Sequence, residues 1–383
     1  LNGFPIEIPP LKDRLEDIPL FVEAFLNNLN QFSLKEIRGV HPLVLEAFEN
    51  YRWPGNIREL ENLVERAYIL EASSLLTPES FPNDLFENEQ LAYLLKYDTV
   101  MGIFKKEVKA TDDALHVGDQ KVAMTAHRDP AAIPWKDLGI DVVIESTGVF
   151  RERAPLEKHL AAGANKVLLT VPAKEEIDAT IVLGVNDDQL KAEHRIVSNA
   201  SCTTNCLAPI AKIIDDSFGI EEGFITTVHA YTNDQRLADV PHKDFRRSRA
   251  AGENIIPTTT GAARAVGKVL PRLKGKLDGL AMRVPVPDGS IVDLVCRLRK
   301  NATTQDVNGA VREAAEGPMQ RVLEYSEEPL VSSDIIGNPH SSIFDALSTS
   351  SLEDGYLRVV SWYDNEWGYS NRVVDLIDKM ATL

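Results

Sequence analysis

Two apolar runs decide the fold: Asp141-Val142-Val143-Ile144-Glu145 and Lys166-Val167-Leu168-Leu169-Thr170. Each run has the length and the β-branched content of a strand that is buried on both faces of a sheet. The segment between them, residues 155–162, reads as a helix. The order strand, helix, strand predicts a parallel sheet, and therefore a domain of the α/β class.

The pattern changes on the carboxyl-terminal side of residue 220. The apolar runs become longer and alternate with polar residues, as in residues 283–298 and 356–362. Alternation with a period of two is typical of strands that have one buried face. We therefore predict a second, α+β lobe that is built on an antiparallel sheet.

Before residue 88 the sequence indicates helices instead. Apolar residues at helical spacing predict helices over 18–32 and 42–51, and a third helix from Asn56 to residue 70. Asn56, with Glu59 three residues later, resembles a capping box, in which two side chains bond backbone N–H groups reciprocally. The polar stretch 80–90 is expected to connect this small all-α part to the rest of the chain.

The composition is that of an ordinary globular protein. Of the 383 residues, 44% are hydrophobic and 26% are charged, and the length predicts two or three domains. Lys and Arg number 41 against 58 Asp and Glu, a net charge of −17, which repels nucleic acids and anionic membranes. No apolar run reaches the roughly 18 residues of a membrane-spanning helix. We therefore expect no nucleic-acid partner and no membrane.

Cysteine usage predicts the compartment. The three cysteines cannot form a disulfide framework in a chain of this length, which favours a reducing, cytoplasmic location. No Cys or His cluster has the spacing of a zinc site, so we predict no metal. The sequence begins at Leu1 rather than at a methionine, and we expect its natural start to lie upstream.

The most informative segment is Ser198-Asn199-Ala200-Ser201-Cys202-Thr203-Thr204-Asn205-Cys206, which precedes an amphipathic run over 207–218. Cys202 is therefore expected at or just before the N-terminus of a helix. Free backbone N–H groups and the positive end of the helix dipole there stabilise a thiolate, lower its pKa and suit an oxyanion. A lone cysteine is more often an inert core residue, which is our interpretation of Cys206.

Further along the chain lie a histidine and several groups that suit anions. His229 follows Cys202 at a distance that allows one helix and a returning strand, so the two side chains are candidates for a Cys–His pair. Arg283, flanked by apolar residues on a predicted strand, needs an anionic partner. Basic residues also gather at 246–249, and Thr258-Thr259-Thr260-Gly261 opens a helix-like stretch that suits a phosphate. Each feature alone is explained as well by a structural role; their combination favours a catalytic site.

From about Leu91 to Leu383 the sequence resembles phosphorylating glyceraldehyde-3-phosphate dehydrogenases. The segment 198–209 matches the active-site signature of that family. Three further segments also read as family motifs: Tyr93-Leu94-Leu95-Lys96-Tyr97-Asp98, Ile144-Glu145-Ser146-Thr147-Gly148-Val149-Phe150 and Trp362-Tyr363-Asp364-Asn365-Glu366-Trp367-Gly368-Tyr369-Ser370.

The resemblance implies a function for each matching residue. Cys202 would attack an aldehyde, and His229 would activate the thiol and assist proton transfer as hydride leaves. Inorganic phosphate would then attack the resulting thioester and release an acyl phosphate, a step of glycolysis. The matching positions are Ser201, Thr203, Thr260 and Gly261 on the inorganic-phosphate side, Thr232 and Arg247 on the substrate-phosphate side, and Arg283 between the two.

The resemblance also implies a nicotinamide cofactor and an assembly. Asn365 matches the residue that fixes the nicotinamide carboxamide, and Arg128 and Thr170 match contacts to the rest of the cofactor. Val240-Pro241 resembles the pair found in members that use NAD, which favours NAD over NADP. Members of the family are homotetramers, so we expect a homo-oligomer.

One part of the family pattern has no counterpart here. The Gly-rich turn that holds the dinucleotide pyrophosphate is absent upstream of Leu91. Asn2-Gly3-Phe4 coincides with three letters of that turn, but prolines follow where glycines are needed. We therefore expect a truncated Rossmann-type sheet and impaired binding of NAD.

Residues 1–86 instead resemble the helical lid of the AAA+ ATPase module in sigma-54-dependent transcription activators. The motifs are Phe4-Pro5-Ile6-Glu7-Ile8-Pro9-Pro10-Leu11-Lys12-Asp13-Arg14 and Trp53-Pro54-Gly55-Asn56-Ile57-Arg58-Glu59-Leu60. The arginine that matches Arg58 senses nucleotide in that family. The phosphate-binding loop G-x-x-x-x-G-K-S/T is absent from this sequence, so ATPase activity is not expected.

We therefore expect four segments: a lid-like fragment (1–86), a truncated NAD-binding domain (87–199), a catalytic domain (200–365) and a C-terminal helix (366–383) that returns to the NAD-binding domain. The combination is more typical of a fusion, misassembly or truncation than of a bifunctional protein. Two alternatives stay open: a regulatory protein whose lid docks on an activator ATPase or RNA polymerase, and a non-catalytic scaffold that uses Cys202 without hydride transfer.

Overall fold

The computed structural model describes residues 9–31, 35–51, 53, 55–71, 73–77, 80–81 and 88–383. The chain divides into two compact units, residues 1–126 with 240–245 and residues 127–239 with 246–383. The motif at Asn2-Gly3-Phe4, Pro54 and much of the expected connector at 80–90 lie outside the described residues.

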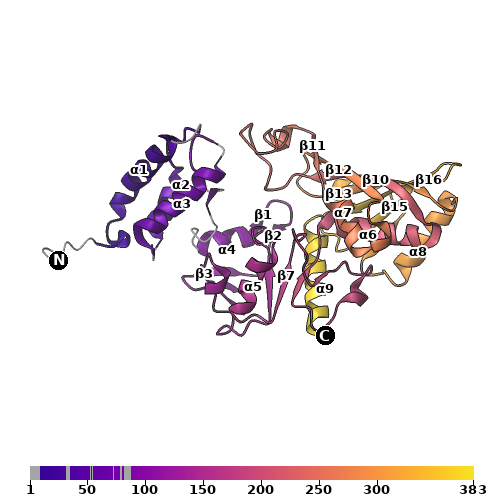
Figure 1. The fold of residues 1–383 in the computed structure, drawn as a ribbon, viewed down its shortest axis with the longest axis horizontal. Coiled ribbons are helices and arrows are strands. Elements are labelled where there is room, and N and C mark those ends of the chain that lie inside the picture. The colour runs from indigo at the N-terminus through magenta and orange to yellow at the C-terminus, as the bar shows by residue number, and fades with distance from the viewer. Residues whose placement is uncertain are drawn as a thin grey trace. The chain divides into compact units, whose positions relative to one another are not determined.

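Three helices form the first part of the first unit: α1 (Ile18–Gln31), α2 (Pro42–Asn50) and α3 (Asn56–Leu70). All three helices predicted from apolar spacing are confirmed, each with ends within one residue of the prediction. They lie together (Figure 1), and their apolar side chains form one core. The buried side chains of this core include Val22, Leu26, Val44, Phe48, Leu60, Leu63 and Val64.

The start of α3 differs from the prediction. Gly55 is the cap residue, whereas Asn56 lies at the first helical position with a φ of 57°. The Oδ1 atom of Asn56 accepts a hydrogen bond from the backbone N–H of Leu11 at 2.8 Å. Glu59 nevertheless reaches back, because its Oε2 accepts the N–H of Gly55 at 2.8 Å. The capping box was therefore wrong for Asn56, since a distant backbone donor engages that side chain.

The rest of the first unit is a short helix and small antiparallel sheets. Helix α4 (Asn88–Lys96) contacts β3, and it leaves Tyr93 and Leu94 63% and 65% exposed. The strands pair as β1 with β2 and as β3-β4-β5. Their bounds are β1 (Tyr97–Asp98), β2 (Gly102–Ile103), β3 (Val108–Thr111), β4 (Ala114–Val117) and β5 (Gln120–Ala123).

The second unit opens with the predicted parallel sheet, whose strand order is β6-β7-β9-β8. Every neighbouring pair in it is parallel. The two decisive apolar runs form β6 and β7, and α5 connects them as predicted. The bounds are β6 (Val142–Glu145), α5 (Arg153–Ala161), β7 (Lys166–Leu169), β8 (Ala179–Thr180) and β9 (Ile196–Ser198).

A seven-stranded sheet forms the remainder of the second unit, in the order β11-β12-β10-β13-β16-β15-β14. Most neighbouring pairs are antiparallel, as predicted, while β10 with β12 and β14 with β15 are parallel. The bounds are β10 (Ile220–Ala230), β11 (Ile256–Thr259), β12 (Leu277–Val284), β13 (Ser290–Leu298), β14 (Leu323–Ser326), β15 (Ser342–Ser351) and β16 (Tyr356–Tyr363).

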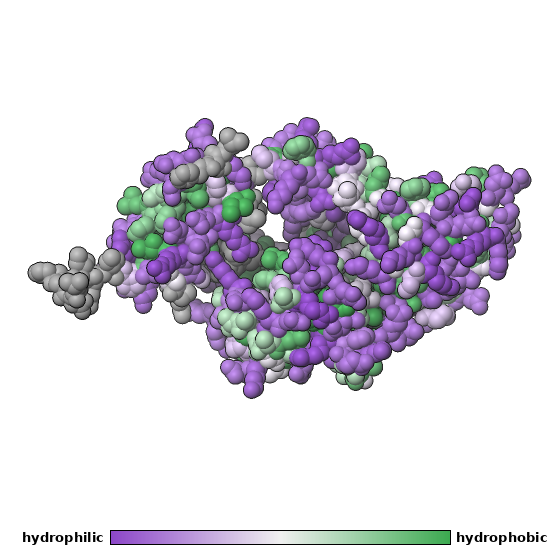
Figure 2. All heavy atoms as spheres, viewed as in Figure 1, coloured by the Kyte–Doolittle hydropathy of each residue, from purple (hydrophilic) through white to green (hydrophobic). Residues whose placement is uncertain are grey.

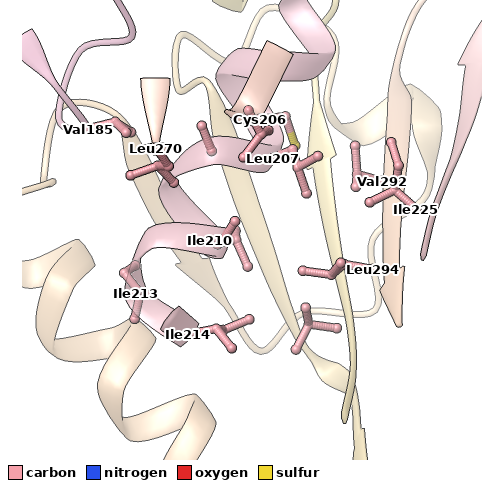
Figure 3. Packing of buried hydrophobic residues seen from close by; sticks show 14 of the residues in the cluster. Val185, Cys206, Leu207, Ile210, Ile213, Ile214, Ile225, Leu270, Val292 and Leu294 are labelled. Carbon is pink, nitrogen blue, oxygen red and sulfur yellow. The ribbon is translucent and has the colours of Figure 1, made fainter. Parts of the chain in front are cut away.

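Helices cover one face of this sheet: α6 (Cys202–Phe218), α7 (Ala262–Val269) and α8 (Thr304–Glu316) (Figure 1). In Figure 3 apolar side chains of α6 point toward the strands, with Leu207 and Ile210 facing Val292, Leu294 and Ile225. A buried helix that packs on a sheet in this way holds its own N-terminus in a fixed place. The fold thereby fixes the position of Cys202, the first residue of α6.

The last helix, α9 (Trp367–Ala381), packs on the parallel sheet. Its Leu376 and Met380 lie against Leu168 of β7, and the carbonyl oxygen of Met380 accepts a hydrogen bond from Nζ of Lys166 at 2.9 Å. On the face seen in Figure 2 hydrophilic residues predominate, with smaller hydrophobic areas among them, in keeping with the net charge of −17.

Candidate active site

The N-terminus of α6 is built around Cys202. Ser201 is the cap residue, and its Oγ accepts the backbone N–H of Thr204 at 3.1 Å. Ala200, which is fully buried, has a φ of 54°, a left-handed conformation that turns the chain from β9 into the helix. Cys202 is half-buried and is the first residue of the helix. The predicted placement of this thiol at a helix N-terminus is confirmed.

His229 faces this thiol from the sheet. The Sγ atom of Cys202 lies 3.6 Å from Nε2 of His229, and the imidazole is 5% exposed. His229 is the second-last residue of β10, and the helix-then-strand connection from α6 returns it beside the start of that helix. A buried imidazole within reach of a thiol is the arrangement of a nucleophile and its base.

Arg283 lies on the other side of the imidazole. Strands β10 and β12 are parallel and in register so that His229 pairs with Arg283. Nη1 of Arg283 is 2.6 Å from Nδ1 of His229 and donates to the carbonyl oxygen of Ala230 at 2.9 Å. Among the described residues no partner bonds its buried Nε. A half-buried guanidinium with an unsatisfied donor is suited to bind an anion.

The partner of Nδ1 decides which nitrogen of the neutral imidazole carries the proton. That atom also lies 2.7 Å from the carbonyl oxygen of Ala230. When Nδ1 carries the proton and donates it to Ala230, the lone pair of Nε2 faces Cys202. When Nδ1 accepts from Arg283 instead, the proton is on Nε2. Abstraction of the thiol proton by Nε2 requires the first tautomer.

Burial shifts the pKa values of both partners toward their neutral forms. Burial, followed by the positive charge of Arg283, lowers the pKa of His229 to about 4. Burial also raises the pKa of Cys202 above its ordinary value, although hydrogen bonds from Thr203 and the charge of Arg283 oppose the rise. The expectation of a lowered thiol pKa was therefore wrong, because it considered the helix N-terminus without the cost of desolvation. Burial thus favours the neutral forms of the Cys202 thiol and the His229 imidazole.

The other two cysteines are core residues. Cys206 is fully buried, and its sulfur lies 3.7 Å from Oγ of Ser342. Cys296 is 1% exposed. Burial raises the pKa of both thiols to about 12. This agrees with the structural interpretation of Cys206.

Two of the predicted substrate-phosphate residues meet at a carboxylate. Asp234 accepts hydrogen bonds from the hydroxyl of Thr232 and from Nη1 of Arg247. Nε of Arg247 also donates to the hydroxyl of Thr258 at 2.9 Å. A hydroxyl and a guanidinium that converge on one anionic group provide the donors that a phosphate requires.

The residues predicted on the inorganic-phosphate side are differently engaged. Thr203 is buried, and its hydroxyl lies 2.9 Å from the hydroxyl of Tyr363. Thr260 accepts the backbone N–H of Ala262 at 3.2 Å, while Gly261 is the cap residue of α7. Within the described chain, hydrogen bonds join neither Thr260 nor Gly261 to Cys202.

The predicted cofactor residues occupy separate places in the second unit. Thr170 follows β7, and its hydroxyl donates to the carbonyl oxygen of Glu145 at 3.3 Å. Asn365 lies between β16 and α9, where its Oδ1 accepts the hydroxyl of Ser290 at 2.6 Å. Arg128 precedes the short helix Pro130–Ala132. The carboxyl ends of parallel strands, where Thr170 lies, are the usual place for a nucleotide in an α/β sheet.

Two tyrosines support the site without having been predicted. Tyr363 bonds both Thr203 on α6 and Thr227 on β10, each hydroxyl at 2.9 Å. Tyr369 of α9 donates to the carbonyl oxygens of Thr170 at 2.6 Å and Ala200 at 3.2 Å. Both tyrosines belong to the quoted segment 362–370, but nothing in a single sequence indicates what their hydroxyls contact.

The described part of the chain shows neither a metal-binding cluster nor a membrane-spanning helix. No group of three or more His, Cys, Asp or Glu side chains there is arranged to hold a metal ion. None of the helices in those residues combines the length and the apolar character needed to cross a membrane.

Comparison with known proteins matches three ranges of the chain to family models. Residues 201–365 match the C-terminal domain of glyceraldehyde 3-phosphate dehydrogenase, and residues 81–153 match the NAD binding domain of the same enzyme. Residues 12–93 match the AAA+ ATPase lid domain.

Individual relatives extend the match along most of the chain. Glyceraldehyde-3-phosphate dehydrogenase 2 of Streptomyces avermitilis is 56% identical over 295 residues, which are 77% of this chain and 88% of the relative. The glyceraldehyde-3-phosphate dehydrogenase of Borreliella burgdorferi is 57% identical over 306 residues, covering 78% and 91%. The chain belongs to the glyceraldehyde-3-phosphate dehydrogenase family. Glyceraldehyde-3-phosphate dehydrogenase 2 of Bacillus subtilis, at 57% identity over 300 residues, gives the same result.

Membership in the glyceraldehyde-3-phosphate dehydrogenase family confirms several predictions. The chain has the α/β fold of an NAD-dependent oxidoreductase, with a parallel sheet and a catalytic domain. NAD is the cofactor that the matched domain binds. The lid-like part is confirmed as a match to AAA+ lids in general, while its origin in a sigma-54-dependent activator stays a prediction.

Proposed function

We propose that this protein oxidises a small phosphorylated aldehyde to an acyl phosphate, with inorganic phosphate as the second substrate. The observation that carries this proposal is the Cys202 thiol 3.6 Å from Nε2 of His229, with the Arg283 guanidinium at the other ring nitrogen. A nucleophile, a base and an anion-binding group thereby surround one position. These are the groups that attack on the carbonyl of a phosphorylated aldehyde requires.

The chemistry follows from the protonation states. Sγ of Cys202 attacks the aldehyde carbon while Nε2 of His229 takes the thiol proton and passes it to the carbonyl oxygen, which gives a hemithioacetal. N–H groups at the start of α6 stabilise the developing oxyanion. Nε2 then takes the hydroxyl proton as hydride leaves the carbon, and a thioester forms on Cys202. Bound NAD supplies the acceptor for that hydride.

Inorganic phosphate completes the cycle. A phosphate oxygen attacks the thioester carbon, the carbon–sulfur bond breaks, and the acyl phosphate leaves. The proton held on His229 returns to the sulfur, so the thiol and the neutral imidazole are restored. An anion beside Arg283 offsets the charge that lowers the imidazole pKa, which makes His229 a stronger base when substrate is bound.

We propose separate residues for the substrate phosphate and for inorganic phosphate. Thr232 and Arg247 would hold the substrate phosphate, exchanging Asp234 for it, and the half-buried Arg283 lies between the two anions. Ser201, Thr203, Thr260 and Gly261 would bind inorganic phosphate. Thr203 has the weakest support, because its hydroxyl already bonds Tyr363.

The cofactor residues fit a nicotinamide dinucleotide. Thr170 lies at the carboxyl end of β7, and Arg128 supplies a cation in the same unit. The amide nitrogen of Asn365 has no partner among the described residues and is not sealed from solvent, so it is free to bond a carboxamide. We propose Arg128, Thr170 and Asn365 as cofactor-binding residues, with NAD favoured over NADP.

The organisation of the whole chain is also proposed. We retain the boundaries at residues 86, 199 and 365, a cytoplasmic location and a homotetramer. Three unpaired cysteines agree with a reducing compartment. An exposed apolar group on the uncovered face of the large sheet agrees with assembly, because isolated domains rarely expose such patches. Its members are Phe224, Leu280 and Val295, with exposures of 71%, 39% and 41%.

The test is formation of NADH from aldehyde, NAD and phosphate by the full chain. Cys202→Ser should abolish the reaction, and His229→Asn should lower kcat by about 10²- to 10⁴-fold, the usual contribution of a general base. NAD affinity should be weaker than that of the Bacillus subtilis relative, because no Gly-rich turn precedes Leu91. Absence of NADH under saturating NAD would refute the proposed reaction, and equal NAD affinity would refute the effect of the missing turn.

A second candidate function rests on the AAA+ lid match at residues 12–93. We propose that this part derives from a sigma-54-dependent activator and acts in regulation rather than in catalysis. Lid domains pack against other parts of an ATPase assembly, and we propose that this one acts by docking on another protein. ATP binding measured on this chain tests the proposal, because tight binding would contradict a role limited to docking.

A further inference from the structure

Ser290 lies between the base and the cofactor residue. It is the first residue of β13 and is 1% exposed. Its Oγ makes two hydrogen bonds, one with the backbone N–H of Ala230 at 3.1 Å and one with Oδ1 of Asn365 at 2.6 Å. The hydroxyl therefore links the residue that follows His229 to the amide proposed to hold the nicotinamide.

The chemistry of these donors fixes the direction of each bond. The N–H of Ala230 is only a donor, so Oγ of Ser290 accepts there. The hydroxyl has a single proton and Oδ1 of Asn365 as its acceptor, so it donates that proton to the amide oxygen. The amide nitrogen of Asn365 then points away from Ser290. Among the described residues that nitrogen has no partner, and it is not sealed from solvent.

The backbone of the same residue, Ala230, also contacts the catalytic groups. The carbonyl oxygen of Ala230 accepts a hydrogen bond from Nη1 of Arg283 at 2.9 Å and lies 2.7 Å from Nδ1 of His229. Its N–H is the group that bonds Ser290. The backbone of Ala230, at the end of β10, therefore contacts the imidazole through its carbonyl oxygen and, by way of Ser290, positions the Asn365 amide through its N–H. Without the hydroxyl, neither orientation of the amide would be preferred over the other by a bond to the protein.

We propose that Ser290 is a positioning residue that orients the Asn365 amide, so that its NH₂ group is presented to the carboxamide oxygen of the nicotinamide. The inference rests on the proposed function and adds a residue to it. It makes the site selective for a cofactor with a hydrogen-bond acceptor at that point. Ser290 itself touches neither substrate nor cofactor and acts through Asn365.

The experiment is a double-mutant cycle with Ser290→Ala, Asn365→Ala and the double variant, assayed for KM and kcat with NAD and aldehyde. Ser290→Ala should raise KM for NAD by about two- to tenfold, the range of one net hydrogen bond. KM for the aldehyde should not change. In the Asn365→Ala background the serine substitution should have no further effect, because its target is gone. Ser290→Thr, which keeps the hydroxyl, should restore most of the affinity.

The control is Ser342→Ala on β15, another fully buried serine of the same sheet, whose Oγ lies 2.7 Å from that of Ser361. It should lower the free energy of unfolding without raising KM for NAD. Equal KM for NAD in wild type and Ser290→Ala, or additive effects in the cycle, would overturn the role of Ser290. If wild type itself forms no NADH, the proposed function fails, and the role of Ser290 fails with it. If Ser290→Ala does not fold, the cycle is run with Ser290→Cys, whose weak donor should give the same loss.

Discussion

Replacing Asp288 with Asn should change how stability depends on pH. Asp288 is fully buried, and its Oδ1 accepts the backbone N–H of Gly289 at 2.8 Å. Beside it lies Asp364, whose carboxylate accepts three backbone N–H groups, those of Gly337, Glu366 and Trp367. Burial, and then the charge of Asp364, raises the pKa of Asp288 from 3.8 to about 7. The folded protein therefore prefers this carboxyl in its neutral form.

The size of the effect follows from that rise. One pKa unit corresponds to about 1.4 kcal/mol, so the folded state loses roughly 4 kcal/mol when Asp288 ionises. Because the folded pKa is raised, this stability is fully present below pH 3.8 and is lost as pH rises toward about 7. The side chain of Asn does not ionise in this pH range, so it stays neutral beside Asp364. The free energy of unfolding of the Asn variant should therefore rise relative to that of wild type as pH increases across that range.

Denaturant unfolding at several pH values between about 4 and 9 measures this difference. The free energy of unfolding of Asp288→Asn, minus that of wild type, should grow by roughly 4 kcal/mol between pH 4 and 7 and stay constant above. Asp354→Asn, at an exposed turn, is the matched control. Its free energy of unfolding should differ from that of wild type by the same amount at every pH. A difference for Asp288→Asn that does not vary with pH would refute the assignment of a neutral carboxyl.

Two further predictions concern the thiols and the lid. Iodoacetamide should alkylate Cys202 well before Cys206 or Cys296, because Cys202 is half-buried whereas the other two are buried and their pKa values are raised to about 12. Peptide mass spectrometry gives the three alkylation rates, and equal rates would contradict this order. Burial alone would raise the pKa of Glu71, but the hydrogen bonds from Ser73, Thr77 and Ser80 outweigh it and lower the pKa to about 2. Glu71→Gln should therefore lower the free energy of unfolding of the helical part by about 3 kcal/mol above pH 4.5. That difference should disappear as pH falls through 2, so an equally large loss at every pH would count against the charged carboxylate.

Local sequence pattern predicted the elements that carry the site. The apolar runs at 141–145 and 166–170 became β6 and β7, and the small polar residues before an amphipathic run placed Cys202 at the start of α6. These predictions succeeded because strand and helix signals depend on residues close together in the chain. The proximity of Cys202 and His229 also follows from a short connection, one helix and one strand long.

The remaining features depend on contacts between distant segments. The parallel pairing that sets His229 beside Arg283 joins residues 54 positions apart, and no periodicity encodes it. The raised pKa of Cys202 reflects burial, which the composition of a helix N-terminus does not reveal. Ser290 is an ordinary serine in sequence, and its importance arises only from the two partners of its hydroxyl.

The bonds from the Tyr369 hydroxyl to the backbone of Thr170 and Ala200 bear on synthesis of the chain. Translation runs from the N-terminus, so Cys202 leaves the ribosome long before Tyr369 is made. A nascent chain thus carries its sulfur on a turn that is not yet anchored. A chain whose synthesis stops before α9 lacks these two hydrogen bonds, and its thiol stays on an unsupported turn. The turn that carries Cys202 is therefore supported only after α9 has been synthesised.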